Sequence, residues 1–295
     1  MVRIFFKYAT FIVAYIFFTT IAIAAPATPD AFQVKVTGKG QPIIFIPGAT
    51  CGGDEWDATI AHLAGKYQCH VLTLAGYAGV PGLPNGPYLE RVRKQLIEYI
   101  NDNHLEQVIL VGHSIGGYLS LYLASEMKDH LAKIFVVDAM PFFAGAQNPN
   151  APDTFSESQA QRMLAMYNGM DDNALKASQY NTAKFLCRDS TYWDKIATWG
   201  AKSDRRTMAY TMSEMLGGDI RKKIAAINIP VLVLGAFCKM PQYPGFTRES
   251  VVKTYSDQYK ACSKCTVHVS EDKARHFIMF DAPEWYFAEL DSFLK

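Results

Sequence analysis

The 295-residue sequence has little net charge and no segment in which charge of one sign accumulates. Its 29 basic residues include Arg3 and Lys7 near the N-terminus, and the other 27 nearly balance the 28 acidic residues. The chain therefore lacks the basic footprint on which nucleic-acid binding depends. Internal repeats and low-complexity tracts are missing as well. About 270 residues remain after the N-terminal segment, a length that suits one α/β domain carrying an insertion.

The N-terminal segment has the layout of a secretory signal. Arg3 and Lys7 form a short basic head, and an uncharged apolar run extends over residues 8–25 and ends in small residues, "TTIAIAAPA". This pattern predicts a signal peptide over residues 1–24, with cleavage after Ala24 and a periplasmic or secreted product. An uncleaved signal is the one route by which we expect the protein to contact a membrane. No cysteine lies near the cleavage position, which argues against a bacterial lipid anchor.

The six cysteines permit disulfides in an exported chain but do not define their pairing. The C-x-x-C motif at Cys262 and Cys265 precedes a strand rather than opening a helix, which makes a redox role a weak interpretation. It also lacks a second pair of ligands at a spacing suited to zinc. Cys51 and Cys238 each follow a strand at the same edge of the expected sheet. We therefore expect them to bond to each other or to Cys187.

Short, continuous apolar segments alternate with amphipathic ones along most of the chain. The expected strands are "AFQVKVTG", "PIIFIPG", "QCHVLTLAG", "QVILVG", "KIFVVDAM", "IPVLVLGAF" and "CTVHVS". Helical spacing occurs in "DEWDATIAHLAGKY", "LERVRKQLIEYINDNHL", "GGYLSLYLASEM", "ESVVKTYSDQYKAC" and "APEWYFAELDSFL". This alternation predicts a mainly parallel sheet with helices on both faces.

The alternation stops between residues 141 and 227, where helix-like segments occur without a clear buried strand. We expect a core formed by residues 25–140 and 228–295, with residues 141–227 forming a helical cap. Long insertions in compact domains are usually functional, and open α/β sheets bind ligands at the carboxyl ends of their strands. A cap over that edge is therefore preferred to a surface decoration.

Ser114 lies in the sequence "GHSIGG", between a buried strand and a helix. Glycines at positions 112, 116 and 117 allow a sharp turn and close packing of the helix against the strand. Such a turn exposes the hydroxyl at the sheet edge and directs the helix N-terminus toward it, which stabilises a developing oxyanion. The alternative is an ordinary turn in which Ser114 is an N-cap. The strand-turn-helix context favours a nucleophile.

A nucleophilic serine needs a base, and His276 has the best position among the seven histidines. It lies in a loop between the last expected strand and the final helix. That loop is at the carboxyl end of the sheet, on the same side as Ser114. His113 is expected to point away from the substrate side. The other histidines lie on helices beside polar residues or within strands.

With these elements in place, the chain resembles the α/β-hydrolase family. The resemblance extends over nearly all of the mature chain, through "IFIPGATCGGDEW", "GHSIGGY", the helical insertion, "IPVLVLGA" and "RHFIMFDAPEW". It implies that Ser114 is the nucleophile and His276 the general base and acid. It also implies an oxyanion hole formed by the N–H groups of Ile115 and a residue after "PG". Ala49 is our first choice for that second donor, and Thr50 is the second.

The third member of the triad departs from the common family pattern. No carboxylate follows "VLVLG" until Glu249. Asp138 ends the preceding strand, and some family members, haloalkane dehalogenases among them, place the acid there. An aspartate at that position would orient the imidazole and stabilise its charged form. We therefore assign the acid to Asp138 ahead of Asp257 and Glu249, although Asp138 could instead only hold the turn that follows.

The sequence thus predicts an exported serine hydrolase that acts on a carboxylic ester or related small acyl substrate, without a metal or organic cofactor. A dehalogenase is disfavoured because it would need a carboxylate in place of Ser114. An aminopeptidase would need acidic groups near the cap, for which Glu157, Asp171 and Asp172 are available. The other alternative is a binding protein or receptor that keeps the scaffold with little turnover.

Overall fold

The computed structural model describes residues 31–127, 129–148 and 150–295. The predicted signal peptide, residues 1–24, lies outside the described residues. The strands are β1 (Phe32–Gly38), β2 (Gln41–Ile46), β3 (Tyr67–Leu74), β4 (Val108–His113), β5 (Leu131–Val137), β6 (Val231–Gly235) and β7 (Cys265–Val269). They form one sheet, in the order β1-β3-β2-β4-β5-β6-β7. Among the described residues, no helix is long and apolar enough to cross a membrane.

The sheet is parallel from β3 to β7, and only β1 at the edge runs antiparallel to its neighbour. Strands β4 and β5 are central and wholly or largely buried, which explains their uninterrupted apolar sequences. β1 lies at the edge of the sheet and is exposed along most of its length, including the apolar residues Val34 and Val36. The predicted mainly parallel α/β fold is confirmed.

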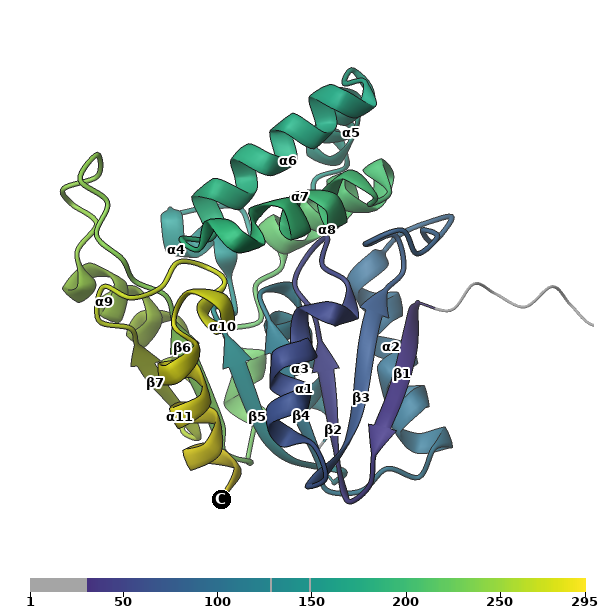
Figure 1. Cartoon of the computed structure of the whole chain (residues 1–295), viewed down its shortest axis with the longest axis vertical. Coiled ribbons are helices and arrows are strands. Elements are labelled where there is room, and N and C mark those ends of the chain that lie inside the picture. Colours follow the sequence, from purple (N-terminus) through teal and green to yellow (C-terminus); the bar gives the residue numbers. More distant parts are fainter. Residues whose placement is uncertain (1–30, 128, 149) are drawn as a thin grey trace, which may run out of the picture.

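Helices cover both faces of the sheet (Figure 1). Those of the core are α1 (Asp57–Leu63), α2 (Tyr88–Asp102), α3 (Ile115–Glu126), α9 (Arg248–Tyr259), α10 (Ile278–Asp281) and α11 (Pro283–Leu294). Alternate residues of β2 point to opposite faces, so that Ile44 packs with α2 and α3 while Phe45 packs with α1 and α11. The sheet therefore lies between two apolar cores and is held rigidly beneath its carboxyl edge.

The chain between β5 and β6 is helical. It contains α4 (Phe143–Gln147), α5 (Glu157–Asn168), α6 (Asp172–Leu186), α7 (Trp193–Ala201) and α8 (Arg205–Gly217). Figure 1 shows α5 to α8 beyond the carboxyl ends of the strands. Ser156, Asp171 and Asp204 begin three of these helices, each with a side chain that accepts a hydrogen bond from a backbone N–H of the first turn. We refer to residues 141–227 as the helical insertion.

Candidate active site

Ser114 stands between β4 and α3 with φ 53° and ψ −118°, a strained conformation for a residue other than glycine. The surrounding packing enforces this turn. A Cβ on Gly112 would lie 2.3 Å from the carbonyl oxygen of Gly116, and one on Gly116 would lie 2.1 Å from that of Ile46. With no side chain at either position, α3 approaches the ends of β2 and β4, and the half-buried Ser114 is placed at the sheet edge.

Asp138 and His276 meet at the same edge. Asp138 follows β5, and the N–H of Ser114 donates to the carbonyl of Val137 at 2.9 Å, so the two residues leave the sheet from neighbouring strand ends. His276 lies in the loop between β7 and α10, and its Nδ1 is 2.6 Å from Oδ2 of Asp138. The rings of His276 and His113, the residue before Ser114, have centroids 4.5 Å apart.

The Ser114 hydroxyl itself makes no hydrogen bond with His276 in the described part of the chain. In enzymes without substrate this contact is often long and shortens only in the Michaelis complex. The structure therefore brings Asp138 and His276 into direct contact and places Ser114 beside them.

The other oxygen of Asp138 is held by two donors. Oδ1 accepts hydrogen bonds from the N–H of Ala236 at 2.7 Å and from the hydroxyl of Tyr255 at 2.6 Å. Burial by itself would raise the pKa of Asp138, but the hydrogen bonds from His276, Tyr255 and Ala236 outweigh it and hold the pKa below its ordinary value. The carboxylate therefore stays ionised and fixes the orientation of the imidazole.

The two expected oxyanion donors lie on adjoining segments. The N–H of Ile115 is in the first turn of α3, where it has no intrahelical partner. Gly116 packs against the end of β2, which brings this turn beside the loop that carries Ala49 and Thr50. That loop is closed by a hydrogen bond from the N–H of Cys51 to the carbonyl of Gly48 at 3.1 Å. Both expected donors thus lie on segments that adjoin Ser114.

The sequence profile of the Alpha/beta hydrolase family matches residues 43–289, which is most of the chain. The chain belongs to the α/β-hydrolase family. Among the curated relatives of this hydrolase is the pimeloyl-[acyl-carrier protein] methyl ester esterase of Vibrio cholerae, 30% identical over 114 residues, which are 39% of this chain and 43% of that protein. The enzyme of the same name from Nitrosomonas europaea is 19% identical over 222 residues, or 69% of this chain and 79% of that protein.

The chain spans less than half the length of the first of these curated relatives. Solved structures resemble the hydrolase over a greater length. A hydrolase from Pseudomonas aeruginosa has a TM-score of 0.72 at 15% identity, covering 89% of this chain and 94% of that one. A thermophilic esterase from Thermogutta terrifontis has a TM-score of 0.69 at 18% identity, covering 89% and 92%. At these identities the likeness establishes the fold.

Sequence reasoning missed Tyr255, Glu55 and the buried partner of His113 in this hydrolase. His113 is fully buried, and its Nδ1 is 2.7 Å from Oε1 of the buried Glu55. Burial by itself would lower the pKa of His113, but the adjacent Glu55 carboxylate raises it above its ordinary value. Glu55 and His113 are 58 residues apart and Tyr255 and Asp138 are 117 apart. No local sequence signal reports such contacts.

The expectation for the cysteines near the site was wrong. Cys51, Cys187 and Cys238 are free and buried, and the disulfide of the described chain joins Cys262 to Cys265. Cys187 instead lies 3.2 Å from Oδ1 of Asp281, within hydrogen-bond reach. The Cys51 thiol is enclosed beside Glu55. Cys51 and Cys238 thus remain unbonded to each other and to Cys187, although both follow strands that end at one edge.

The three acidic residues that an aminopeptidase could use have structural partners within the helical insertion. Glu157 accepts hydrogen bonds from Tyr210 and Gln161, Asp171 caps α6, and Asp172 pairs with Arg205. All three acidic residues are exposed. Their carboxylates are thus engaged with the helices themselves, which gives no support to a pocket for a substrate amine.

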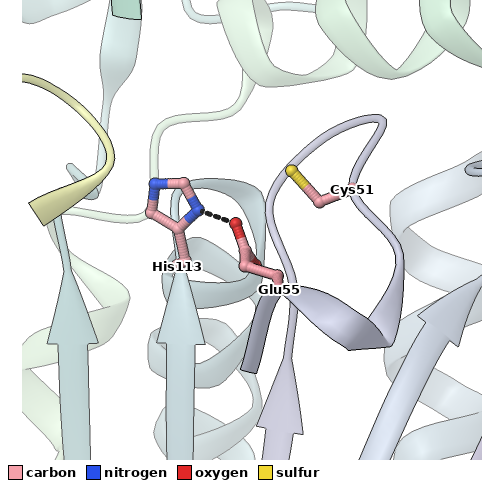
Figure 2. A group of neighbouring side chains, drawn as sticks. All are labelled: Cys51, Glu55 and His113. Atoms are coloured by element: carbon pink, nitrogen blue, oxygen red, sulfur yellow. Dashed lines mark hydrogen bonds and ion pairs between the residues drawn. The ribbon is translucent and has the colours of Figure 1, made fainter. Parts of the chain in front are cut away.

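One group of potential metal ligands occurs close to the site within the described residues. Single donor atoms of Cys51, Glu55 and His113 all lie within 4.8 Å of one another, and all three residues are buried. Figure 2 shows Glu55 and His113 directed toward each other, with Cys51 on the adjoining loop. The group includes neither Asp138 nor His276, but the ring of His113 lies against that of His276.

Proposed function

We propose that the protein is a serine hydrolase that cleaves a carboxylic ester or related acyl substrate through Ser114, His276 and Asp138. The observation that carries this proposal is the 2.6 Å hydrogen bond between His276 and Asp138, at the edge where the strained turn presents Ser114. The relatives named as methyl ester esterases support an ester in preference to an amide.

In the first half of the reaction, Oγ of Ser114 attacks the substrate carbonyl while Nε2 of His276 accepts its proton. The Asp138 carboxylate holds Nδ1–H and stabilises the imidazolium that forms. The N–H groups of Ile115 and Ala49 stabilise the oxyanion of the tetrahedral intermediate. His276 then returns the proton to the leaving alkoxide, and the acyl group remains on Ser114.

In the second half, His276 removes a proton from water, which attacks the acyl-enzyme. The second tetrahedral intermediate collapses to the carboxylic acid as His276 returns that proton to Ser114. None of these steps requires a metal or an organic cofactor. The N-terminal sequence supports a proposal that the enzyme acts in the periplasm or outside the cell, after cleavage behind Ala24. N-terminal sequencing of the mature protein tests that location.

The chemical test is labelling with a fluorophosphonate, followed by peptide mapping, together with hydrolysis of p-nitrophenyl acetate. We expect label on Ser114 in the wild-type protein and loss of both label and turnover in His276→Ala. The small ester serves as a control, because it tests turnover with a substrate that needs little space beneath the helical insertion. A folded protein that neither takes label nor turns over the small ester would refute the proposal and favour a binding protein on the same scaffold.

A further inference from the structure

Glu55 is a buried carboxylate outside the Ser114, His276 and Asp138 set. It lies in η1 (Gly53–Trp56), and only 1% of its surface is exposed. Burying a carboxylate is costly unless it is paired or hydrogen-bonded. Its two oxygens face different segments of the active-site edge.

Hydrogen bonds accepted by Glu55, together with one between His113 and His276, link three functional segments. Oε2 accepts from the N–H of Gly48 at 3.0 Å, and Oε1 is 2.7 Å from Nδ1 of His113. On the other side of the ring, Nε2 of His113 lies 3.1 Å from the carbonyl oxygen of His276. A carbonyl oxygen only accepts, so Nε2 carries a proton. These bonds join the loop that carries Ala49, the residue before Ser114 and the backbone of His276.

The packing around this network leaves little freedom. A Cβ on Gly48 would lie 2.7 Å from Nδ1 of His113 and 3.4 Å from Sγ of Cys51. The N–H of Gly48 is committed to Glu55, which is consistent with assigning the oxyanion donor to the next residue, Ala49. A shift of Glu55 would therefore move the loop that carries this donor.

We propose that Glu55 is a positioning residue, whose carboxylate holds Gly48 and His113 and through them sets the Ala49 N–H and the His276 backbone relative to Ser114. This inference rests on the proposed function. Glu55 acts through other groups and touches no reacting atom. Misplacement of a catalytic group by about 1 Å can cost on the order of a hundredfold in rate, so such a link has kinetic consequences.

The same residues could in principle bind a metal ion, because a thiol, an imidazole and a carboxylate suit zinc. The hydrogen bonds favour the positioning role of Glu55 over a metal site. Both oxygens of Glu55 and both ring nitrogens of His113 already have partners, and a metal ion would displace the contact between them. Burial, followed by the charge of Glu55, raises the pKa of the Cys51 thiol, which favours its neutral form over the thiolate that metals bind.

Two substitutions at Glu55 separate position from charge. In Glu55→Gln the amide oxygen can accept from Gly48, while the amide nitrogen donates to Nδ1 of a neutral His113 that still donates to His276. All three links survive without the charge. In Glu55→Ala, Gly48 and His113 lose their partner. The matched control is Thr59→Val, which removes a neighbouring buried hydrogen bond to Tyr286 without touching the loop.

The experiment measures kcat and KM for p-nitrophenyl acetate, with thermal midpoints for each variant. We expect Glu55→Gln to keep kcat within about threefold, and Glu55→Ala to lower kcat by about 10- to 100-fold with KM little changed. Thr59→Val should lower the thermal midpoint without lowering kcat. The Nε2–H proton of His113 should give a slowly exchanging NMR signal in the wild-type protein and in Glu55→Gln, and should exchange faster in Glu55→Ala, where the ring is no longer held at Nδ1.

The outcomes distinguish the two proposals. Absence of turnover and of label in the folded wild-type protein would refute the proposed function, whereas the NMR signal still reports the link. An active wild-type enzyme whose folded Glu55→Ala variant keeps full kcat would overturn the positioning role alone. A fall in kcat for Thr59→Val equal to that for Glu55→Ala would reduce the effect to general destabilisation. Stoichiometric metal in the purified protein, measured by elemental analysis, would also overturn the inference.

Discussion

Asp138→Asn tests the proposed triad most directly, because the two oxygens of Asp138 have different partners. Oδ1 accepts from the N–H of Ala236 and the hydroxyl of Tyr255, and Oδ2 accepts from Nδ1 of His276. Asparagine offers one accepting oxygen and one donating nitrogen. Since the Ala236 N–H can only donate, the asparagine oxygen should take the place of Oδ1. Its NH₂ group then faces His276.

That arrangement forces the wrong tautomer on the base. Nδ1 of His276 must accept from the asparagine, so the ring proton moves to Nε2, which can no longer take the proton of Ser114. We expect kcat to fall by about a thousand- to ten-thousandfold, which corresponds to about 4–5.5 kcal/mol in the activation barrier at about 1.36 kcal/mol per tenfold. The turn itself should persist, because Asn keeps the volume of Asp.

The assay compares initial rates on p-nitrophenyl acetate for the wild type, Asp138→Asn and two matched carboxylate variants, Glu249→Gln and Asp257→Asn. Glu249 and Asp257 are exposed, and Asp257 pairs with Lys253. Neither variant should change kcat. A folded Asp138→Asn enzyme that keeps a tenth or more of the wild-type activity would refute this reasoning, and so would an equal loss in either matched variant.

Three further predictions follow from the same geometry. Tyr255→Phe removes one donor from Asp138 and should lower kcat by about 3- to 30-fold, while the pKa of Asp138 rises toward its ordinary value; an unchanged rate would show that the hydroxyl contributes nothing. Gly116→Ala should lower the free energy of unfolding by about 3 kcal/mol or more, measured by urea denaturation, because the new Cβ would lie 2.1 Å from a backbone oxygen; a stable variant would contradict the close approach. Burial lowers the pKa of His113, but Glu55 raises it above its ordinary value, so the charged pair should stabilise the fold fully below about pH 6.5 and lose that contribution as pH rises through the folded-state pKa. The urea midpoint of Glu55→Gln should not show this decline at alkaline pH. The same pH dependence in the wild type and in Glu55→Gln would argue against the charged pair.

Much of the fold follows from local sequence because buried parallel strands are short, apolar and bounded by turns. Helix α7, within the insertion, is harder to predict from sequence for a physical reason. It is only nine residues long, so its apolar pattern, with Ile196, Ala197, Trp199 and Gly200 buried, repeats over little more than two turns. Its place in the structure depends on packing against α6, which the sequence of α7 alone does not reveal.

The candidate site divides in the same way. Ser114, Asp138 and His276 could be proposed because each follows a recognisable strand, and parallel strands end at one edge. Glu55 and Tyr255 could not, because a charged or aromatic residue on a helix reads as solvated or as core until the fold shows what it faces. Cysteine pairing failed for a related reason: proximity of strand ends does not set the direction of a side chain.

The way the helical insertion joins the sheet has a consequence for engineering. The insertion begins after β5 and returns toward β6. The N–H of Ile220 donates to the carbonyl of Pro141 at 3.0 Å, so the two ends of the insertion lie side by side. Another segment with closely spaced ends could replace residues 142–219 without altering the order of the strands, provided that it restores the hydrogen bonds that Ser203, Asp204 and Glu214 make with the core. Exchanging the segment between these two ends would give chimeric proteins that share one sheet and differ only in the exchanged segment.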